Sequence, residues 1–444
     1  MTRDSQLRFE LNQLDVEALR QKQRAVGRKA LVKEFIQFWA GQNAHTKSIL
    51  QSPQHGARVK ELALFLETIT ESLAAFATER TPTYYPYTDV HVLDWFIGKS
   101  HEKFATSKSR AITGILYLIK DLAEFEGESL AGFRSSSMQN FDKEAVPGRL
   151  AVLGEMKNSC DYLGIRIMGD KWPPEEDTKH FKDLDGYVQE SHRISGLRHF
   201  SCFPQTPFHD EVLFLRVIHI SELCFFGIRF AIMQAIEDLR YKAADGAVEA
   251  LTDASGFAVI LQKGFKVLRT MPPERFKDFR EDTGKASAIQ SRNYQLMEAY
   301  FRGMHADKKE HFAKIDHLGF MSHFRHKSFL HLGAALERFA ASPLAVQAAR
   351  DLDRKLLAWR GAHLGFAKLY LADMPRGTGD TSGAPYLQKF LDTGLFRDME
   401  LDLETMEDLL PGISQLLEGV RVPPHGTIAP PASQMAKRAK AKIL

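Results

Sequence analysis

The sequence has little of what marks a secreted, membrane-bound or nucleic-acid-binding protein. Its 444 residues include only three cysteines and no CxxC pair, too few for a disulfide framework. No stretch reaches the roughly 18 uninterrupted apolar residues of a membrane-spanning helix, and the N-terminal MTRDSQLRFE lacks the apolar core of a signal peptide. A net charge of +3 gives no indication of nucleic acid binding. We therefore expect a cytoplasmic protein with neither a membrane nor a nucleic acid as its partner.

Alternating strand patterns are almost absent as well. Apolar residues instead recur at helical spacing along much of the chain, and a hydrophobic content of 44% is enough for a large core. The sequence thus predicts an all-α fold, a helical bundle. Ser342 and Pro343 form a typical helix start. The clearest helices are expected at 61–77, 109–125, 209–239, 246–270, 272–279 and 342–374.

Polar, Pro-rich and Gly-rich segments divide this helical pattern. They predict breaks at 81–90, 132–149 and 169–181. We place the main boundary near residue 180. The Pro-rich and then basic tail predicts disorder. The expected organisation is an N-terminal helical region of unknown role at 1–180, a second helical domain at 181–419 and a disordered tail at 420–444.

One expected helix carries a histidine on its apolar face. The spacings of four, three, four, three and four place these side chains on one stripe, with His363 in the middle: Leu352, Leu356, Trp359, His363, Phe366 and Tyr370. Such a histidine can be a core residue whose ring a neighbour satisfies. It can equally be an axial ligand, because a neutral imidazole facing an apolar cavity suits the proximal side of a b-type haem.

The helix expected at 209–239 is apolar nearly all round, which predicts that it is surrounded by protein. It nevertheless contains ionisable residues, and these are costly to bury unless they are paired or used. His219 and Glu222 lie three apart on one face. They could form a buried structural pair, or His219 could border a site where a ligand needs a proton donor, which makes His219 the candidate catalytic residue.

Two further segments contain candidate ligand-binding residues. Arg280 lies beside Phe276 and Phe279, and an arginine among aromatic residues suits the two-pronged recognition of a carboxylate, although it could be an ordinary surface residue. The glycine-rich RGTGDTSG segment at 376–383 is not a P-loop. Its glycines would let the backbone close over a small ligand, with Thr378 supplying a hydroxyl.

The order of these motifs resembles that of the tryptophan 2,3-dioxygenase family, an all-helical, haem-dependent group among the haem-based aromatic oxygenases. The resemblance covers roughly residues 183–400 and does not extend to the first 180. It rests on LDGYVQ, HDEVLF with SEL, VLRTMPPERFKDFR, ASAIQS, WRGAH and RGTGDTSG, in that order.

The resemblance implies a role for each matching residue. His363 falls at the position of the haem iron ligand and Arg280 at that of the arginine that binds the substrate carboxylate. The remaining positions are Thr378 near the substrate ammonium group, Phe214 and Ile218 in the substrate pocket, Ser287 near the haem propionate and substrate, and Tyr187 and Val188, which in the family's tetramer enter a neighbouring subunit's pocket.

Two positions depart from the family pattern. Ile218 falls where the family has its distal histidine, and His219 is the next residue. One residue is a turn of about 100° on a helix, so His219 reaches the haem only if the helix is locally adjusted. Phe276 replaces a tyrosine that helps to bind the carboxylate, which removes a hydrogen bond worth about 1 kcal/mol or more.

The resemblance implies an enzyme with haem b as its cofactor, acting on an aromatic amino acid with O2 and forming a homo-oligomer, either a dimer or a tetramer. The expected reaction is O2 insertion into the indole ring of L-tryptophan or a derivative, giving an N-formylkynurenine-type product. Two alternatives remain open. One is a haem-dependent mono-oxygenase of tryptophan derivatives or tyrosine; the other is a non-catalytic haem-binding or ligand-binding helical protein.

Overall fold

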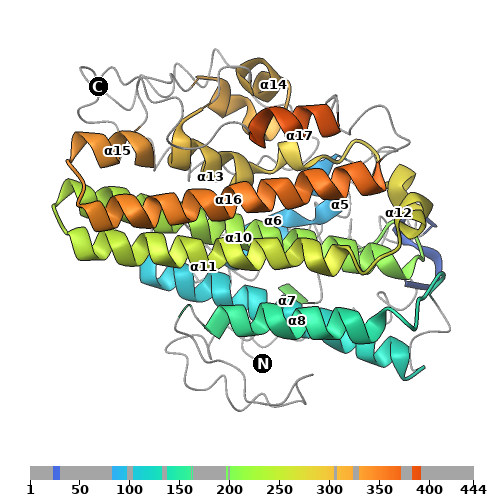
Figure 1. Ribbon diagram of the computed structural model, residues 1–444. Helices are drawn as coiled ribbons and strands as arrows, with labels where there is room; N and C mark the ends of the chain where they lie inside the picture. The colour runs from blue at the N-terminus through green and yellow to red at the C-terminus, as the bar shows by residue number, and fades with distance from the viewer. Residues whose placement is uncertain are drawn as a thin grey trace, which may run out of the picture.

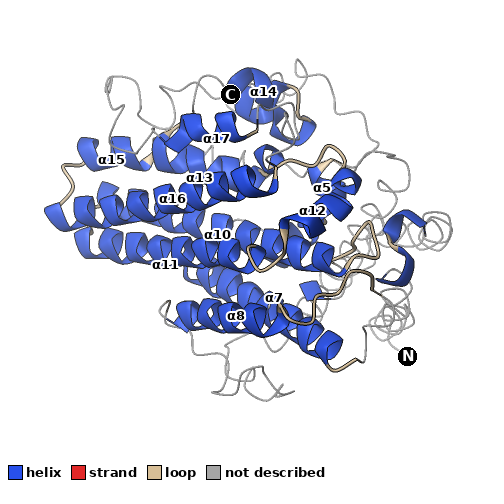
Figure 2. Ribbon diagram, turned by 45° about the vertical axis from the view of Figure 1, so that its right-hand side comes forward, coloured by secondary structure: helices blue, strands red, loops and turns tan. Residues whose placement is uncertain are grey.

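The computed structural model describes residues 24–30, 83–97, 104–132, 138–161, 163, 197–198, 201–304, 308–323, 330–371 and 383–391. Regular structure in these segments is helical, apart from one isolated bridge between Gln139 and Phe208, as Figure 2 shows. The all-α prediction is therefore confirmed. None of the helices in these segments is both long and apolar enough to cross a membrane.

The helices fall into two groups along the chain. The first comprises η1 (Arg28–Ala30), α5 (Tyr84–Thr88), α6 (Val90–Ile97), α7 (Phe104–Leu130) and α8 (Val146–Asp161). The second comprises α10 (His209–Arg240), α11 (Ala244–Leu268), α12 (Pro273–Arg280), η4 (Glu281–Thr283), η5 (Ala288–Gln290), α13 (Arg292–Arg302), α14 (Lys309–Ala313), η7 (Asp316–His323), α15 (Leu332–Arg338), α16 (Pro343–Tyr370) and α17 (Ala384–Leu391).

Local sequence signals account well for the long helices. The expected helices at 109–125, 209–239, 246–270, 272–279 and 342–374 correspond to α7, α10, α11, α12 and α16. At the start of α16 the Ser342 hydroxyl accepts a hydrogen bond from the Ala345 amide, and Pro343 follows the cap. Such a cap satisfies one of the amides that a helix leaves unpaired.

Two predicted breaks are partly wrong. The segment 81–90 contains α5, a short helix that ends when Asp89 adopts a left-handed conformation with φ of 53°, and α6 begins directly after it. Helix α8 begins at Val146, inside the loop predicted at 132–149. Short-range turn signals mark these segments, but packing against the core makes the backbone helical there.

Several predictions fall outside the described residues. They concern the helix at 61–77, the break at 169–181, the tail at 420–444 and the boundary near residue 180. Buried side chains from helices on both sides of that position belong to one hydrophobic core, which includes α7 and α8 as well as α10 and α11. The division into domains at 180 stays a prediction.

Helix α10 is the centre of this core. It packs most extensively against α11 and α7, and also against α13 and α15. Figure 1 shows α16 and α13 on one side of it and α7 and α8 on the other. This arrangement explains why α10 is apolar nearly all round, because a helix with protein on every side has no solvent face.

The buried ionisable residues of α10 are paired, as their burial requires. Arg216 is fully buried and binds Asp121 of α7 through its Nε at 2.8 Å. Its other nitrogens donate to the backbone oxygens of Ser201 and Arg198 at 3.2 and 2.7 Å. Arg216 therefore ties α10 to α7 and to the segment that precedes α10.

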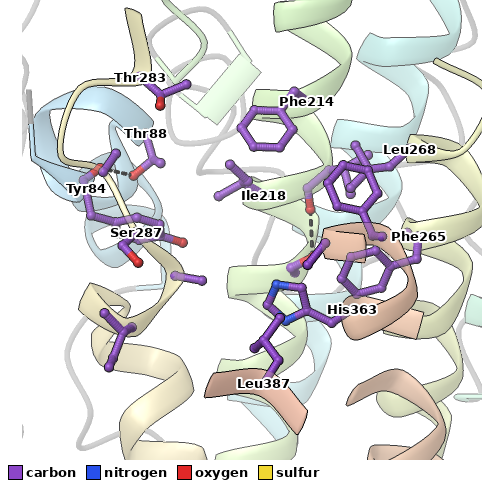
Figure 3. Close-up of a pocket in the computed structure, with 18 of the residues that line it drawn as sticks. Tyr84, Thr88, Phe214, Ile218, Phe265, Leu268, Thr283, Ser287, His363 and Leu387 are labelled. Atoms are coloured by element: carbon purple, nitrogen blue, oxygen red, sulfur yellow. Dashed lines mark hydrogen bonds between the residues drawn. The ribbon is translucent and has the colours of Figure 1, made fainter. Parts of the chain in front are cut away.

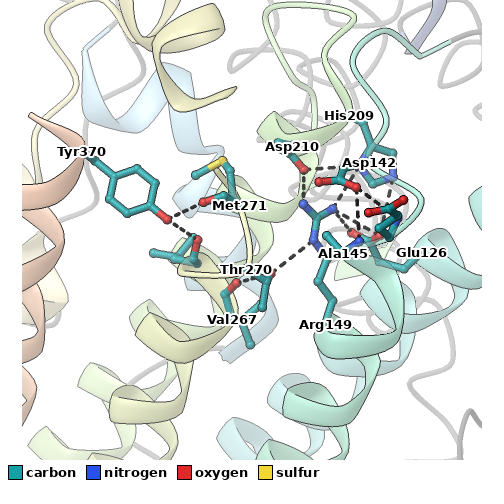
Figure 4. A network of polar contacts seen from close by, with 12 residues as sticks. Glu126, Asp142, Ala145, Arg149, His209, Asp210, Val267, Thr270, Met271 and Tyr370 are labelled. Carbon is teal, nitrogen blue, oxygen red and sulfur yellow. Dashed lines mark hydrogen bonds and ion pairs between the residues drawn. The ribbon is translucent and has the colours of Figure 1, made fainter. Parts of the chain in front are cut away.

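A second buried network joins α7, α8 and the start of α10 (Figure 4). Arg149 of α8 lies 3.1 Å from Glu126 and 2.6 Å from Asp210, and its Nε donates to Thr270 at 3.2 Å. The ring of His209 lies 3.4 Å from the same guanidinium, measured from Nδ1 to Nη1. One arginine thus neutralises carboxylates from two helices inside the core.

Replacing Arg149 by methionine would leave Glu126 and Asp210 buried without their cation. Because breaking a buried pair from one side costs about 3–5 kcal/mol, we expect the free energy of unfolding to fall by that amount. Urea unfolding at neutral pH measures it. The matched control is Lys263→Met, since the Lys263–Glu155 pair lies at the surface and its loss should matter far less. Equal effects of the two substitutions would contradict this account.

Candidate functional site

A cavity of about 240 Å³ lies between α10, α11, α12 and α16, closed further by α5, α17 and the η5 loop. The residues that each long helix contributes are three, four or seven apart, and residues at these spacings lie on one face of a helix. On α10 these are Phe214, Val217, Ile218, Ser221 and Phe225, and on α11 they are Leu261, Gly264, Phe265 and Leu268. Most of the residues that line the cavity are apolar.

His363 of α16 lines this cavity (Figure 3). Its ring stacks on Phe265 with centroids 5.3 Å apart and lies 5.9 Å from the ring of Trp359. The described residues include no hydrogen-bond partner for it, and it is exposed only in part. Burial lowers the pKa of His363 from 6.5 to about 4. The imidazole is therefore neutral at physiological pH, and it can present a nitrogen lone pair to a ligand in the cavity.

Arg280 lines the cavity from the end of α12. Its Nη1 donates to the Thr283 hydroxyl at 2.7 Å, and Thr283 also lines the cavity. Burial lowers the pKa of Arg280, yet the described residues provide no carboxylate within ion-pair distance of it. A half-buried guanidinium without an acidic partner is suited to bind an anionic group of a ligand.

Aromatic rings surround the space next to Arg280. Phe214 and Phe276 contact each other edge to face with centroids 5.4 Å apart, and Phe276 meets Phe366 in the same way at 5.8 Å. Phe214, Ile218, Phe276 and Ser287 all line the cavity. The structure thus brings these four residues together with His363 and Arg280 in one pocket.

His219 does not line this pocket. Helix α10 is continuous from His209 to Arg240, so the turn of about 100° per residue points Ile218 into the cavity and His219 away from it. The Nε2 of His219 hydrogen-bonds to the backbone oxygen of Thr88, and its Nδ1 lies 3.4 Å from Arg216. The expected catalytic position of His219 in the pocket thus needs correction, because no local adjustment of the helix turns it inward.

Three other predicted site residues lie outside the described part of the chain. They are Thr378, Tyr187 and Val188. Their roles stay predictions.

Helix α5 contributes to the cavity although local sequence patterns did not indicate it. Tyr84, Tyr87 and Thr88 line the cavity, although we expected only a turn-rich break in this segment. The tyrosines are three residues apart and so share a helical face, a signal that was readable only once a helix was assumed there. Thr283 was missed as well, since nothing in its local sequence marks it.

The fold and the site define an all-helical protein with a ligand pocket, and part of its chain is similar to a class of oxidoreductases, the dioxygenases. Within that class, residues 183–328 match the model of the tryptophan 2,3-dioxygenase family. The matched segment includes Phe214, Arg280 and Ser287 and ends before His363. The resemblance and the expectation of an enzyme are confirmed.

Individual relatives agree with this family. A tryptophan 2,3-dioxygenase of Burkholderia cenocepacia is 26% identical over 236 residues, covering 44% of this chain and 76% of that protein. One from Ruegeria pomeroyi is 28% identical over 242 residues, covering 44% of this chain and 84% of that protein. Tryptophan 2,3-dioxygenase 1 of Ralstonia nicotianae is 25% identical over 239 residues, with 44% and 80% covered.

The pKa of His363 can be measured directly. In the ligand-free protein its imidazole should take up a proton near pH 4, far below the ordinary 6.5. The unfolded chain binds this proton at higher pH, so the residue reduces folding stability as the pH falls from 6.5 towards 4. NMR titration of 15N-labelled histidines, with His363→Phe to assign the signal, tests this. A midpoint near 6.5 would mean that water solvates the ring freely.

Proposed function

We propose that this protein is a haem-dependent dioxygenase that inserts O2 into the indole ring of L-tryptophan or a derivative, giving an N-formylkynurenine-type product. The observation that carries the proposal is the neutral imidazole of His363, which faces an apolar cavity and lacks a hydrogen-bond partner among the described residues. The family match over residues 183–328 supports the reaction class.

The residues of the pocket fit a haem b group in their chemistry. His363 would ligate the iron, because a neutral imidazole in an apolar environment is a proximal ligand. Ser287, which lines the same cavity, would meet a propionate. When bound there, ferrous haem supplies the activation of O2 that the protein's own side chains cannot provide.

The chain's own residues would bind and orient the amino acid. Arg280, with no carboxylate partner among the described residues, would hold the substrate carboxylate through its two-pronged donor set. Thr283 already accepts a hydrogen bond from this guanidinium and keeps it in place. Thr378 would meet the ammonium group. Holding the substrate at both charged groups fixes where its ring lies, which is the main contribution of positioning to the rate.

The aromatic part of the pocket would hold the ring and keep water out. Phe214, Ile218 and Phe276 provide a dry surface beside Arg280. In the overall reaction both oxygen atoms enter the substrate at the two carbons of the indole double bond, and the bond between these carbons is broken. No other oxidant or reductant is consumed.

A mono-oxygenase of an aromatic amino acid is the second candidate. It is favoured by two residues that line the pocket and differ from the family pattern: Phe276, which lacks the hydroxyl of a tyrosine, and Ile218, which replaces the distal histidine. Turnover under 18O2 separates the two, because a dioxygenase product gains two labelled atoms and a hydroxylated product gains one.

Substitution of His363 by alanine tests the proposed cofactor. We expect the purified wild-type protein, reconstituted with haem, to show a Soret band and turnover, and His363→Ala to lose the haem-linked activity. The matched control is His331→Asn, which replaces an imidazole that caps α15 by another good capping residue. A wild-type protein that never binds haem would refute the proposal.

Substitution of Arg280 by glutamine tests substrate recognition separately. Loss of a charge-assisted contact worth about 1.5–3 kcal/mol should raise KM on the order of 10- to 100-fold, with an unchanged Soret band. Lys277→Gln, on the exposed side of the same helix, should leave KM as it is. The KM of each variant is measured by steady-state kinetics, with the amino acid that the wild-type protein turns over. An unaltered KM in Arg280→Gln would place the carboxylate elsewhere.

A further inference from the structure

The pocket includes a wall from the part of the chain that precedes the family match. Tyr84, Tyr87 and Thr88 of α5 line the cavity, whereas the matched segment begins at residue 183. Figure 3 shows Tyr84 and Thr88 across the pocket from Phe265 and His363. Aromatic rings at this position provide flat surfaces against which a substrate ring can pack.

Two buried residues of α10 hold this wall in place. The Tyr84 hydroxyl donates to Oε1 of Glu222 at 2.6 Å, and the Thr88 backbone oxygen is hydrogen-bonded to Nε2 of His219. The Tyr84 amide also donates to the side chain of Gln290 at 3.0 Å. Both ends of α5 are therefore attached to the elements that form the rest of the pocket.

These contacts also satisfy polar groups that could not remain buried alone. Glu222 and His219 are fully buried, and burial raises the pKa of Glu222. Glu222 accepts a second hydrogen bond from Asn293 at 2.9 Å. Removing α5 would leave the carboxylate and the imidazole with fewer partners inside the protein, which costs more than the bonds themselves contribute. The α5 wall is accordingly a fixed part of the site.

A second anchor lies at the end of α5. Asp89, which ends this helix, pairs with the fully buried Arg28 at 3.2 Å. Arg28 belongs to η1, which comes well before α5 in the chain. Its backbone amide donates a hydrogen bond to the Pro204 backbone oxygen at 3.0 Å. Arg28 thus ties the end of α5 to the segment that precedes α10.

We infer that α5 completes the substrate pocket within a single chain, with His219 and Glu222 as the positioning residues that hold it. The inference rests on the proposed function. It gives the N-terminal region a role, and it means that a neighbouring subunit need not supply this wall, unlike the arrangement that the family resemblance implies for Tyr187 and Val188. It also explains why α10 buries a histidine and a glutamate that do not reach the cavity.

Complementation between two defective chains tests the single-chain pocket. One chain carries His363→Ala and the other Tyr84→Ala with Tyr87→Ala, and the two are co-expressed with different tags and purified over both. We expect mixed oligomers to be no more active than the two variants alone, because each pocket keeps its own defect. If a partner supplied α5, each mixed dimer would contain one intact pocket and recover about half of the wild-type activity, which would overturn the inference.

A second measurement covers the case in which the two tagged chains do not assemble with each other. If no mixed oligomer is recovered, the wild-type activity per chain is measured over a wide range of protein concentration. Constant activity of a monomer supports the inference. Activity that appears only on oligomerisation, in a protein whose chains bind haem at every concentration, contradicts it.

Conservative substitutions test the positioning role without removing the wall. Tyr84→Phe and Glu222→Met should each raise KM severalfold while the Soret band is unchanged, and the double variant should be no worse than Glu222→Met alone, because that substitution already removes the oxygen that accepts from Tyr84. Tyr241→Phe, which removes the hydroxyl of an exposed tyrosine, is the matched control. Additive effects of the two substitutions would overturn the assigned contact.

This test also distinguishes failure of the inference from failure of the proposed function. The same double-variant comparison can be made on the unfolding midpoint of the protein without haem. Non-additive shifts there would support the Tyr84–Glu222 contact even if the wild-type protein proved to bind no haem. Additive shifts together with normal haem binding would reject the contact and leave the proposed function standing.

Discussion

The burial of α10 on all sides is the constraint from which the rest of the structure follows. A helix in this position cannot send its polar side chains to water, so each ionisable group needs a partner from a neighbouring element. Arg216 binds Asp121 of α7, and Asp210 binds Arg149 of α8. These pairings fix the positions of the N-terminal helices relative to the centre of the bundle.

The same constraint shapes the pocket. The face of α10 that carries Phe214 and Ile218 is left facing a cavity, while the face with His219 and Glu222 holds α5 against it. Because α10 is a regular helix, these two faces cannot exchange roles. A ligand in the cavity would therefore meet mainly apolar walls, with His363 and Arg280 among its polar contacts.

Much of the fold was accessible from residue spacing. Helices α7, α10, α11, α12 and α16 carry apolar stripes at helical period, and capping residues mark the start of α16. The short helix α5 was not accessible in this way, since five residues give too few turns for a periodic signal and its stability comes from packing. His363 could be singled out because a polar ring interrupts an otherwise apolar stripe.

The sequence by itself determined the all-helical class, the long helices and the order of motifs that identifies the family segment, because each of these depends on residues close together in the chain. It left open whether His219 faces the pocket and what the first 180 residues contribute. Only the tertiary structure decided that His219 turns towards Thr88 and that Tyr84 reaches Glu222, 138 residues away in the chain. Such contacts depend on how whole helices pack, and local sequence patterns do not encode that packing.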